Sequence, residues 1–130
     1  NIIEGGNNYG WPIVTAGLDY SGARISPFTE HGQDYTAPLR EWLPDSIAPS
    51  GLAVYRGEAF PNWNGDLLIG ALAGQALHRV RVENGQAIAE EILLADEGAR
   101  IRDVRVGPDG LVYVLTDHAN GAVLRLSPAD

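Results

Sequence analysis

The sequence of 130 residues contains no cysteine and no hydrophobic run long enough to cross a membrane as a helix. The missing cysteines exclude disulfides and cysteine-ligated metals, and they leave the redox compartment undetermined. A membrane-spanning helix needs about 20 consecutive apolar residues, so no membrane span is predicted. Basic residues are also scarce, since nine Lys and Arg stand against 17 Asp and Glu. An acidic chain repels phosphate backbones, and nucleic acid is therefore not an expected partner.

The short motifs that mark common active sites are missing as well. There is no phosphate-binding P-loop, no GxSxG nucleophile elbow, no HExxH zinc motif and no EF-hand loop. The three histidines, His31, His78 and His118, are scattered, and no two of them have the spacing of metal ligands. His78 alternates with its neighbours in a strand-like run, so its side chain is predicted to lie on the surface. No catalytic residue and no metal ligand is assigned to this chain.

Glycine and proline, by contrast, are abundant, with 16 and eight residues that favour a fold with many turns. Four dipeptides accept the positive φ angles that a two-residue hairpin needs at both central positions: Asn64-Gly65, Asn84-Gly85, Asp109-Gly110 and Asn120-Gly121. A strand-like run follows each of them. The run at 87–94 has some helix propensity, but its position between strands favours an outer strand. Successive hairpins predict an all-β fold.

Two parts of the chain repeat the same pattern. Residues 67–72 and 76–80 correspond to 111–116 and 122–126, and both copies end in arginine followed by an apolar residue. A repeat of about 40–50 residues with about four short strands is typical of a β-propeller blade. A β-sandwich is the alternative all-β fold, although sandwiches rarely repeat in this way.

The repeat predicts a division of the chain into three parts. Residues 51–94 form a complete blade, with strands at 51–56, 66–72, 76–82 and 86–94. Residues 95–130 form a last, incomplete blade, with strands at 101–106, 111–116 and 121–127. Residues 1–50 supply the tail of a preceding blade and a long loop. About two and a half blades of antiparallel four-stranded sheets are expected, and the chain is interpreted as a fragment that begins inside a fold.

Arg100 and Arg102 are the most informative polar residues. Residues two apart in an extended segment share a face, so these side chains are expected to project together. Adjacent guanidiniums repel one another unless an anion lies between them, and their planar forks suit a ligand with several carboxylates. The alternative is an ion network with Glu97 or Asp103, and spacing alone does not decide between the two.

A second cluster lies between Trp42 and Leu52, where Pro44 and Pro49 restrict the backbone ahead of the first strand of the complete blade. Such a loop, at the start of an inner strand, is expected to face the central cavity of a propeller. Trp42 could stack on a flat ligand there, or it could pack between blades.

Four segments occur in the order in which a known family carries them: Asn8–Pro12, Ser46–Gly51, Arg100–Val104 and Pro108–Asp117. Together they resemble the soluble quinoprotein aldose and glucose dehydrogenases, which use pyrroloquinoline quinone (PQQ). The resemblance covers nearly the whole chain. It implies a six-bladed β-propeller in which the quinone lies across the top of the central channel. It also implies a periplasmic or secreted parent enzyme that oxidises the anomeric carbon of an aldose sugar to a lactone.

The same resemblance suggests which residues contact the cofactor. Arg100 and Arg102 correspond to the paired arginines that lie at the carboxylates and quinone face of PQQ. Ser46 falls where the family carries a hydroxyl residue near the cofactor, and Trp42 lies close to the position of its cavity tryptophan. Ala73 replaces a cofactor-binding lysine of the glucose dehydrogenases, which suggests the aldose-dehydrogenase branch. The family's histidine base and the ligands of its calcium ion match no residue here, so calcium is expected only in the intact parent.

The chain alone is therefore predicted to be inactive, and to associate with itself or with the missing part. Apolar side chains on the blade faces are not expected all to be covered within this chain, among them Ile69, Leu77, Val112, Val114 and Leu124. Two other functions remain as alternatives. A lactonase-type propeller hydrolase would need inward metal ligands, for which Asp103 and Asp117 are the candidates. A non-catalytic binding propeller would lack the arginine pair.

Overall fold

The computed structural model describes residues 1–129. The chain divides into two compact units, Asn1–Ser46 and Ile47–Asp130. The described part of the first unit consists of turns and bends with two isolated bridges, Val14–Phe28 and Leu18–Arg24. All strands of the described residues lie in the second unit. None of the helices in residues 1–129 is long and apolar enough to cross a membrane.

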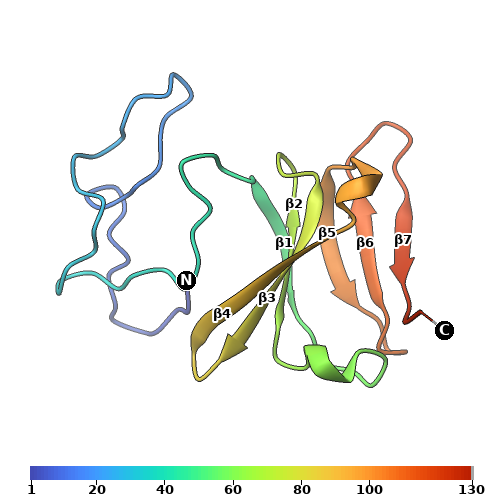
Figure 1. Ribbon diagram of the computed structural model, residues 1–130. Coiled ribbons are helices and arrows are strands. Elements are labelled where there is room, and N and C mark those ends of the chain that lie inside the picture. Colours follow the sequence, from blue (N-terminus) through green and yellow to red (C-terminus); the bar gives the residue numbers. More distant parts are fainter. Residues whose placement is uncertain (130) are drawn as a thin grey trace. The chain divides into compact units, whose positions relative to one another are not determined.

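The second unit contains two antiparallel sheets (Figure 1). The first has four strands in sequence order: β1 (Pro49–Val54), β2 (Leu67–Ala71), β3 (Ala76–Glu83) and β4 (Gln86–Leu93). The second has three: β5 (Ile101–Val106), β6 (Val112–Thr116) and β7 (Val123–Leu126). Two short 3-10 helices, η1 (Pro61–Trp63) and η2 (Ala95–Glu97), lie in the connections. The strands occur where the turn dipeptides predict them, and the run at 87–94 is a strand.

The turns themselves are of different kinds. Asn84 and Gly85 have φ angles of 50° and 74°, as a two-residue hairpin requires. Asn64-Gly65 forms a type II turn instead, with φ −58° and ψ 122° at Asn64 and φ 91° at Gly65. At Asp109-Gly110 only the glycine has positive φ. The expectation of positive φ at both positions therefore holds for one dipeptide, because the spacing of the flanking strands selects the turn type.

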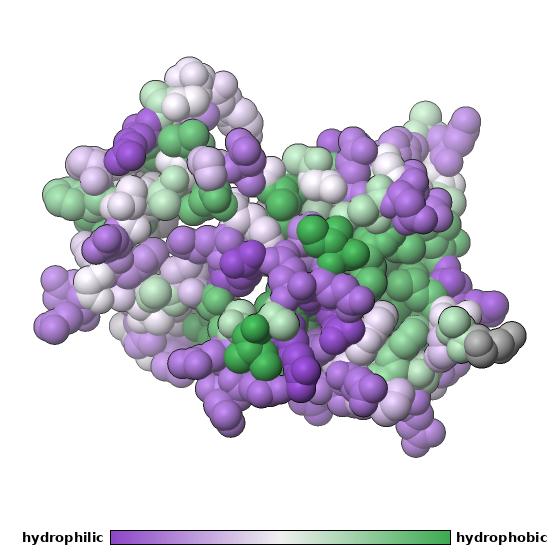
Figure 2. All heavy atoms as spheres, in the orientation of Figure 1, coloured by the Kyte–Doolittle hydropathy of each residue, from purple (hydrophilic) through white to green (hydrophobic). Residues whose placement is uncertain are grey.

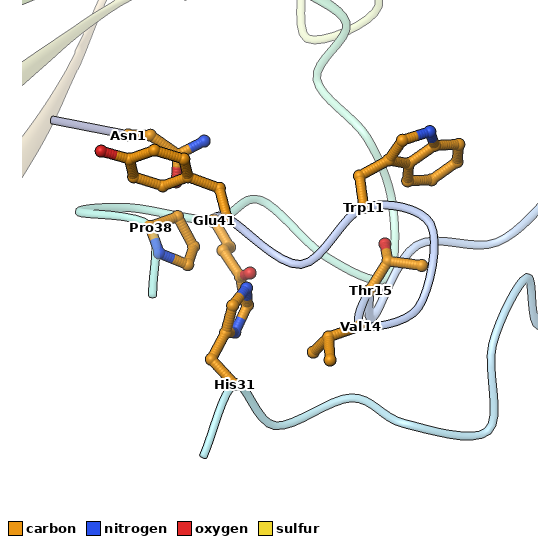
Figure 3. A pocket seen from close by; sticks show the side chains of 8 residues that line it. Asn1, Trp11, Val14, Thr15, His31, Pro38 and Glu41 are labelled. Atoms are coloured by element: carbon orange, nitrogen blue, oxygen red, sulfur yellow. The ribbon is translucent and has the colours of Figure 1, made fainter. Parts of the chain in front are cut away.

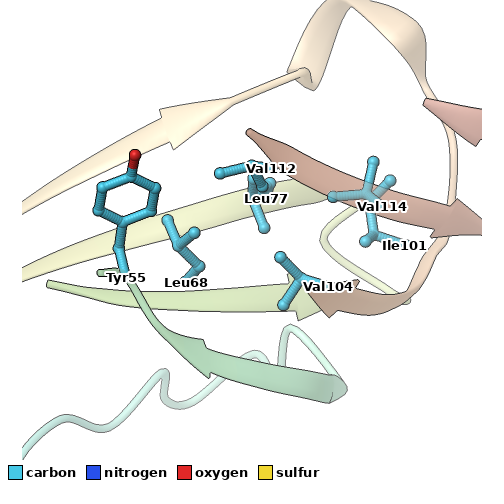
Figure 4. Packing of buried hydrophobic residues seen from close by; sticks show 7 residues of the cluster. All are labelled: Tyr55, Leu68, Leu77, Ile101, Val104, Val112 and Val114. Atoms are coloured by element: carbon cyan, nitrogen blue, oxygen red, sulfur yellow. The ribbon is translucent and has the colours of Figure 1, made fainter. Parts of the chain in front are cut away.

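The two sheets pack against each other through one hydrophobic core (Figure 4). The first sheet and the turn after β1 contribute Tyr55, Leu68 and Leu77, and the second sheet contributes Ile101, Val104, Val112 and Val114. All seven side chains are fully buried. Each large aliphatic side chain that is buried in this way contributes about 1.5–3 kcal/mol to stability. The core between the sheets is therefore the main source of stability in this unit.

Strands β1 and β5 approach so closely that Gly51 has no room for a side chain. A Cβ atom there would lie 2.6 Å from the Cα of Asp103 and 2.9 Å from the nitrogen of Val104. Nearby, the Ser50 hydroxyl donates a hydrogen bond of 2.6 Å to the carbonyl of Ile101. At the other end of the interface, the Tyr55 hydroxyl donates to the carbonyl of Gly110 at 2.7 Å. Hydrogen bonds thus fix both ends of the contact between the sheets.

The expectation that His78 lies on the surface is wrong. His78 is only 4% exposed, and its Nδ1 lies 2.6 Å from Oε1 of Glu90. The reason is that β3 is a central strand, and at Leu77 and His78 both of its faces are buried. Of the five apolar side chains that were not expected all to be covered, Ile69, Leu77, Val112 and Val114 are buried and Leu124 is half-buried. The exposed apolar side chains of this unit are others, among them Leu52, Ile92, Leu115 and Val123. Figure 2 shows hydrophobic surface over the β5–β7 sheet.

Candidate functional site

Two arginines and an aspartate meet at the end of the second sheet where β5 begins and β6 ends. Arg100 immediately precedes β5, Arg102 is its second residue, and Asp117 follows β6. The backbone N–H of Asp117 donates to the carbonyl of Arg100 at 2.7 Å, so the hairpin pairing continues beyond the strands. Asp117 and Arg100 are therefore held opposite each other by the backbone.

A β-bulge determines where Arg102 points. Ile101 lies opposite Thr116 and Asp103 lies opposite Leu115, so β5 contains one residue more than β6 at this point. A bulge of this kind redirects side chains and is common next to functional sites. The side chain of Ile101 enters the core, whereas Arg102 is exposed and reaches Asp117. The side chains of Arg100 and Arg102 thus project to the same place, as their spacing predicts.

Asp117 accepts hydrogen bonds from both guanidiniums. Nε and Nη2 of Arg100 each lie 3.1 Å from Oδ2 of Asp117. Nε of Arg102 lies 3.4 Å from Oδ1, and its Nη2 lies 3.0 Å from Oδ2. These contacts, those of Arg102 first, hold the pKa of Asp117 below the usual range of an aspartate. One carboxylate thus faces two guanidiniums, and the three groups together carry a net positive charge.

The cluster is open to solvent, with side-chain exposures of 43% for Arg100, 53% for Arg102 and 32% for Asp117. Charges exposed to this extent are screened by water and salt, so the pairing contributes little to stability. The cluster can bind a further anion, because each guanidinium has five N–H donors and Asp117 accepts hydrogen bonds from only two of them.

The carboxylate in this cluster belongs to neither Glu97 nor Asp103, the two candidate ion-pair partners. Asp103 instead pairs with Arg105, at 3.0 Å between Oδ2 and Nη2, and Glu97 lies in η2. A signal for Asp117 was present in the sequence. The hairpin predicted around Asp109-Gly110 brings the residues before β5 and after β6 together.

Trp42 and Ser46, the other two predicted cofactor residues, belong to the first unit. Trp42 is half-buried, and the guanidinium carbon of Arg40 lies 5.8 Å from the centroid of its ring, in the range of a cation–π contact. Ser46 is exposed and is the last residue of that unit. The arginines belong to the second unit, so the structure describes the two halves of the predicted site separately.

The first unit also contains a small pocket of about 160 Å³ (Figure 3), lined by Asn1, Tyr9, Trp11, Val14, Thr15, His31, Pro38 and Glu41. The Tyr9 hydroxyl is already engaged, since it donates to the carbonyl of Ile2 at 2.9 Å. Trp11 points away from His31. Ligand pockets usually exceed about 300 Å³, so this hollow is too small to be the main site. Within residues 1–129, no group of three or more His, Asp or Glu side chains is arranged to hold a metal ion.

Comparison with known proteins identifies the family. The glucose/sorbosone dehydrogenase family matches residues 1–125. The chain belongs to this family. It is 43% identical over 129 residues to the aldose sugar dehydrogenase YliI of Escherichia coli. The matched region covers 98% of this chain and 34% of that protein. A crystal structure of a glucose dehydrogenase is 44% identical, with a TM-score of 0.86 over 95% of this chain and 36% of that one.

A more distant solved structure shares the fold alone. It is the PQQ-bound form of an aldose sugar dehydrogenase from Streptomyces coelicolor, 24% identical, with a TM-score of 0.61 over 94% of this chain and 34% of that one. The two packed antiparallel sheets and these likenesses confirm the prediction of an all-β, partial β-propeller. The chain spans about a third of the length of the curated relatives it matches.

Proposed function

We propose that this chain is part of a quinoprotein sugar dehydrogenase, in which Arg100 and Arg102 bind carboxylates of PQQ. The observation that carries the proposal is the convergence of both guanidiniums on the carboxylate of Asp117. A pair that already binds one carboxylate has the donors and the charge to bind a cofactor with several. Membership of the glucose/sorbosone dehydrogenase family supports the reaction class. The PQQ-bound structure with the same fold supports the choice of cofactor.

The proposed reaction of the intact protein is the oxidation of the anomeric carbon of an aldose to a lactone. The quinone, when bound, supplies the acceptor for the hydride that leaves this carbon. Arg100 and Arg102 would hold the quinone by its carboxylates and would stabilise negative charge on it. The hydroxyl proton of the sugar passes to a histidine base. We place that base outside this chain, because His78 is buried against Glu90 and neither His31 nor His118 matches the base of the family.

The other parts of the site follow from the resemblance. We place Ser46 beside the cofactor as a hydroxyl donor and Trp42 in the wall of the cavity. Calcium would be held by residues outside this chain. Ala73 at the position of a lysine favours an aldose dehydrogenase, and a periplasmic or secreted location goes with that assignment.

The isolated chain is expected to be inactive, because a positioned base alone contributes about 10²–10⁴-fold to such a reaction. We also expect it to associate through its uncovered surfaces. Leu115 and Val123 are 42% and 64% exposed on the second sheet, and β7 is an edge strand of that sheet. Exposed apolar patches and open strand edges both promote pairing with another chain. Light scattering at micromolar concentration tests this, and a stable monomer would contradict it.

The test of the function is a titration of the intact parent protein with PQQ, followed by absorbance with and without calcium. Arg102→Ala should weaken quinone binding by about 1–3 kcal/mol, the usual cost of losing charge-assisted hydrogen bonds. Arg105→Ala is the matched control, since Arg105 lies on the same strand, is more exposed and pairs with Asp103. A parent that hydrolyses lactones and does not bind the quinone would be a hydrolase. One with neither activity would be a binding propeller.

A further inference from the structure

We propose that Asp117 is a positioning residue that aligns Arg100 and Arg102, so that their remaining donor edges face the carboxylates of the quinone. This inference rests on the proposed function of the two arginines. It assigns a role to a negatively charged residue in a site that is proposed to bind an anion.

The hydrogen bonds place Asp117 on the same edge of both guanidiniums. In each arginine the donors to Asp117 are Nε and Nη2, at 3.0–3.4 Å. A guanidinium has a second edge, formed by Nη1 and Nη2, which can bind another carboxylate through two parallel hydrogen bonds. Because Asp117 binds the Nε–Nη2 edge of both guanidiniums, it leaves the Nη1–Nη2 edge of each for a ligand.

The second part of the argument concerns repulsion between the arginines. Two guanidiniums that lie close together push each other apart unless an anion lies between them. Asp117 is that anion, and its own position is fixed by the backbone hydrogen bond from its N–H to the carbonyl of Arg100, at 2.7 Å. The lowered pKa of Asp117 is consistent with a carboxylate that stays ionised between the two arginines. The pair is therefore oriented before the cofactor arrives, which lowers the entropic cost of binding.

An aspartate in an anion site could also act as a competitor, and the two roles predict opposite results. If Asp117 only repels the ligand and blocks the arginines, its replacement by asparagine should strengthen quinone binding. If it aligns the arginines, the same replacement should weaken binding even though the site becomes more positive. The sign of the change therefore decides between the roles.

The experiment measures PQQ affinity in the intact parent protein with calcium present. We expect Asp117→Asn to weaken binding by about tenfold or more, the scale of a lost charge-assisted hydrogen bond. We also expect its affinity to depend more steeply on salt, because the site has lost a negative charge. Asp109→Asn is the matched control: it removes the same charge from the same sheet, but at the turn between β5 and β6, and it should leave affinity unchanged.

Asp117→Glu keeps the charge and displaces the carboxylate by one methylene group. If Asp117 aligns the arginines, this variant should have a quinone affinity between those of the wild type and the asparagine variant. If Asp117 only competes with the ligand, the variant should lose no quinone affinity. This variant decides the question if Asp117→Asn does not fold, which thermal melting in the absence of quinone would show. Positioning further predicts that Asp117→Asn costs much less in an Arg102→Ala background, because one of the two aligned groups is then gone.

Unchanged or tighter binding in both Asp117 variants would overturn the inference. If Arg102→Ala weakened binding in the same experiment, the proposed function would stand without it. A wild-type parent that fails to bind the quinone would overturn the proposed function and this inference together.

Discussion

Residues 47–130 bury seven large side chains between two sheets, whereas the buried side chains of residues 1–46 are few, with Val14 and Ser26 as the main examples among those described. The first unit also exposes large apolar side chains, including Ile3 at 74%, Trp11 at 68% and Phe28 at 61%. The two units differ in composition, since leucine and valine account for four of the first 46 residues and for 19 of the 84 that follow. They also differ in whether strands bring the apolar residues onto one face.

Local polar contacts take the place of a core in the first unit. The Asp19 carboxylate accepts hydrogen bonds from the backbone of Ser21 at 2.8 Å and of Ala23 at 3.0 Å, which closes a turn. The Ser26 hydroxyl donates to the carbonyl of Ile13 and accepts from the N–H of Phe28. Segments with few buried apolar contacts open more easily than core strands. We therefore expect slower amide hydrogen exchange in the second unit than in the first.

The largest difference in stability between the two units should appear when a core side chain is truncated. Leu77→Ala removes a fully buried side chain between the sheets and should lower the free energy of unfolding by about 2–5 kcal/mol. Val14→Ala in the first unit removes less buried volume and should cost about 1.5 kcal/mol. Urea unfolding of both variants measures the two costs. A larger loss for Val14→Ala would mean that the first unit contributes more to stability than its burial indicates.

A methyl group added at a glycine tests the packing of the two units directly. Gly51→Ala places a Cβ against the backbone of Asp103 and Val104, which cannot move cheaply, and should destabilise by about 1–3 kcal/mol. Gly5→Ala is the counterpart in the first unit, where nothing lies within 4 Å of the new atom. It should leave the melting temperature nearly unchanged. Equal shifts in the two melting temperatures would contradict the difference in packing.

Two tyrosines offer a smaller test, since each bridges two backbone groups with its hydroxyl. Tyr55 is fully buried; its hydroxyl donates to Gly110 and accepts from Phe60 at 3.0 Å. Tyr9 makes the same pair of bonds to Ile2 and Glu4 in an exposed setting. Tyr55→Phe should cost about 1–2 kcal/mol because it leaves buried groups unpaired. Tyr9→Phe should cost a few tenths at most, since water replaces the lost bonds, and thermal unfolding would compare the two.

The smallest effect should be on the pH dependence of stability. The pKa of Asp117 is lowered by Arg102 and Arg100, that of Asp109 mainly by the Tyr113 hydroxyl, and that of Asp19 mainly by the Ser21 hydroxyl. A carboxyl whose pKa is lower in the folded state stabilises the fold above the ordinary aspartate pKa of about 3.9, and this contribution is lost as the pH falls. Urea midpoints should therefore decrease below about pH 4. Asp109→Asn and Asp19→Asn should each make this decrease in urea midpoint smaller. An unchanged decrease in both variants would contradict the lowered pKa values of the two aspartates.

Much of the second unit was predictable from local sequence. The four dipeptides with glycine bracketed the strands, and the run at 87–94 was correctly assigned to a strand because of its neighbours. The shared direction of Arg100 and Arg102 agrees with the expectation from alternation, although a bulge at Arg102 contributes to it. The partner Asp117 was missed, although the predicted hairpin brings the residues before β5 and after β6 together; the bulge between Ile101 and Asp103, which the sequence did not indicate, determines where Arg102 points. Burial of His78 was missed because alternation assumes that one face of a strand is exposed.

The sequence by itself determined the hairpins, the repeat that relates the two sheets, and the residue types of a carboxylate-binding site. These depend on turn chemistry and on the two-residue period of a strand, which act over a few residues. Only the tertiary structure decided that Gly51 would lie against β5, that both faces of β3 would be buried, and that Arg100 and Arg102 would converge on Asp117. Each of these depends on strand register or on how one sheet packs against another, and a one-residue change of register alters which side chains meet.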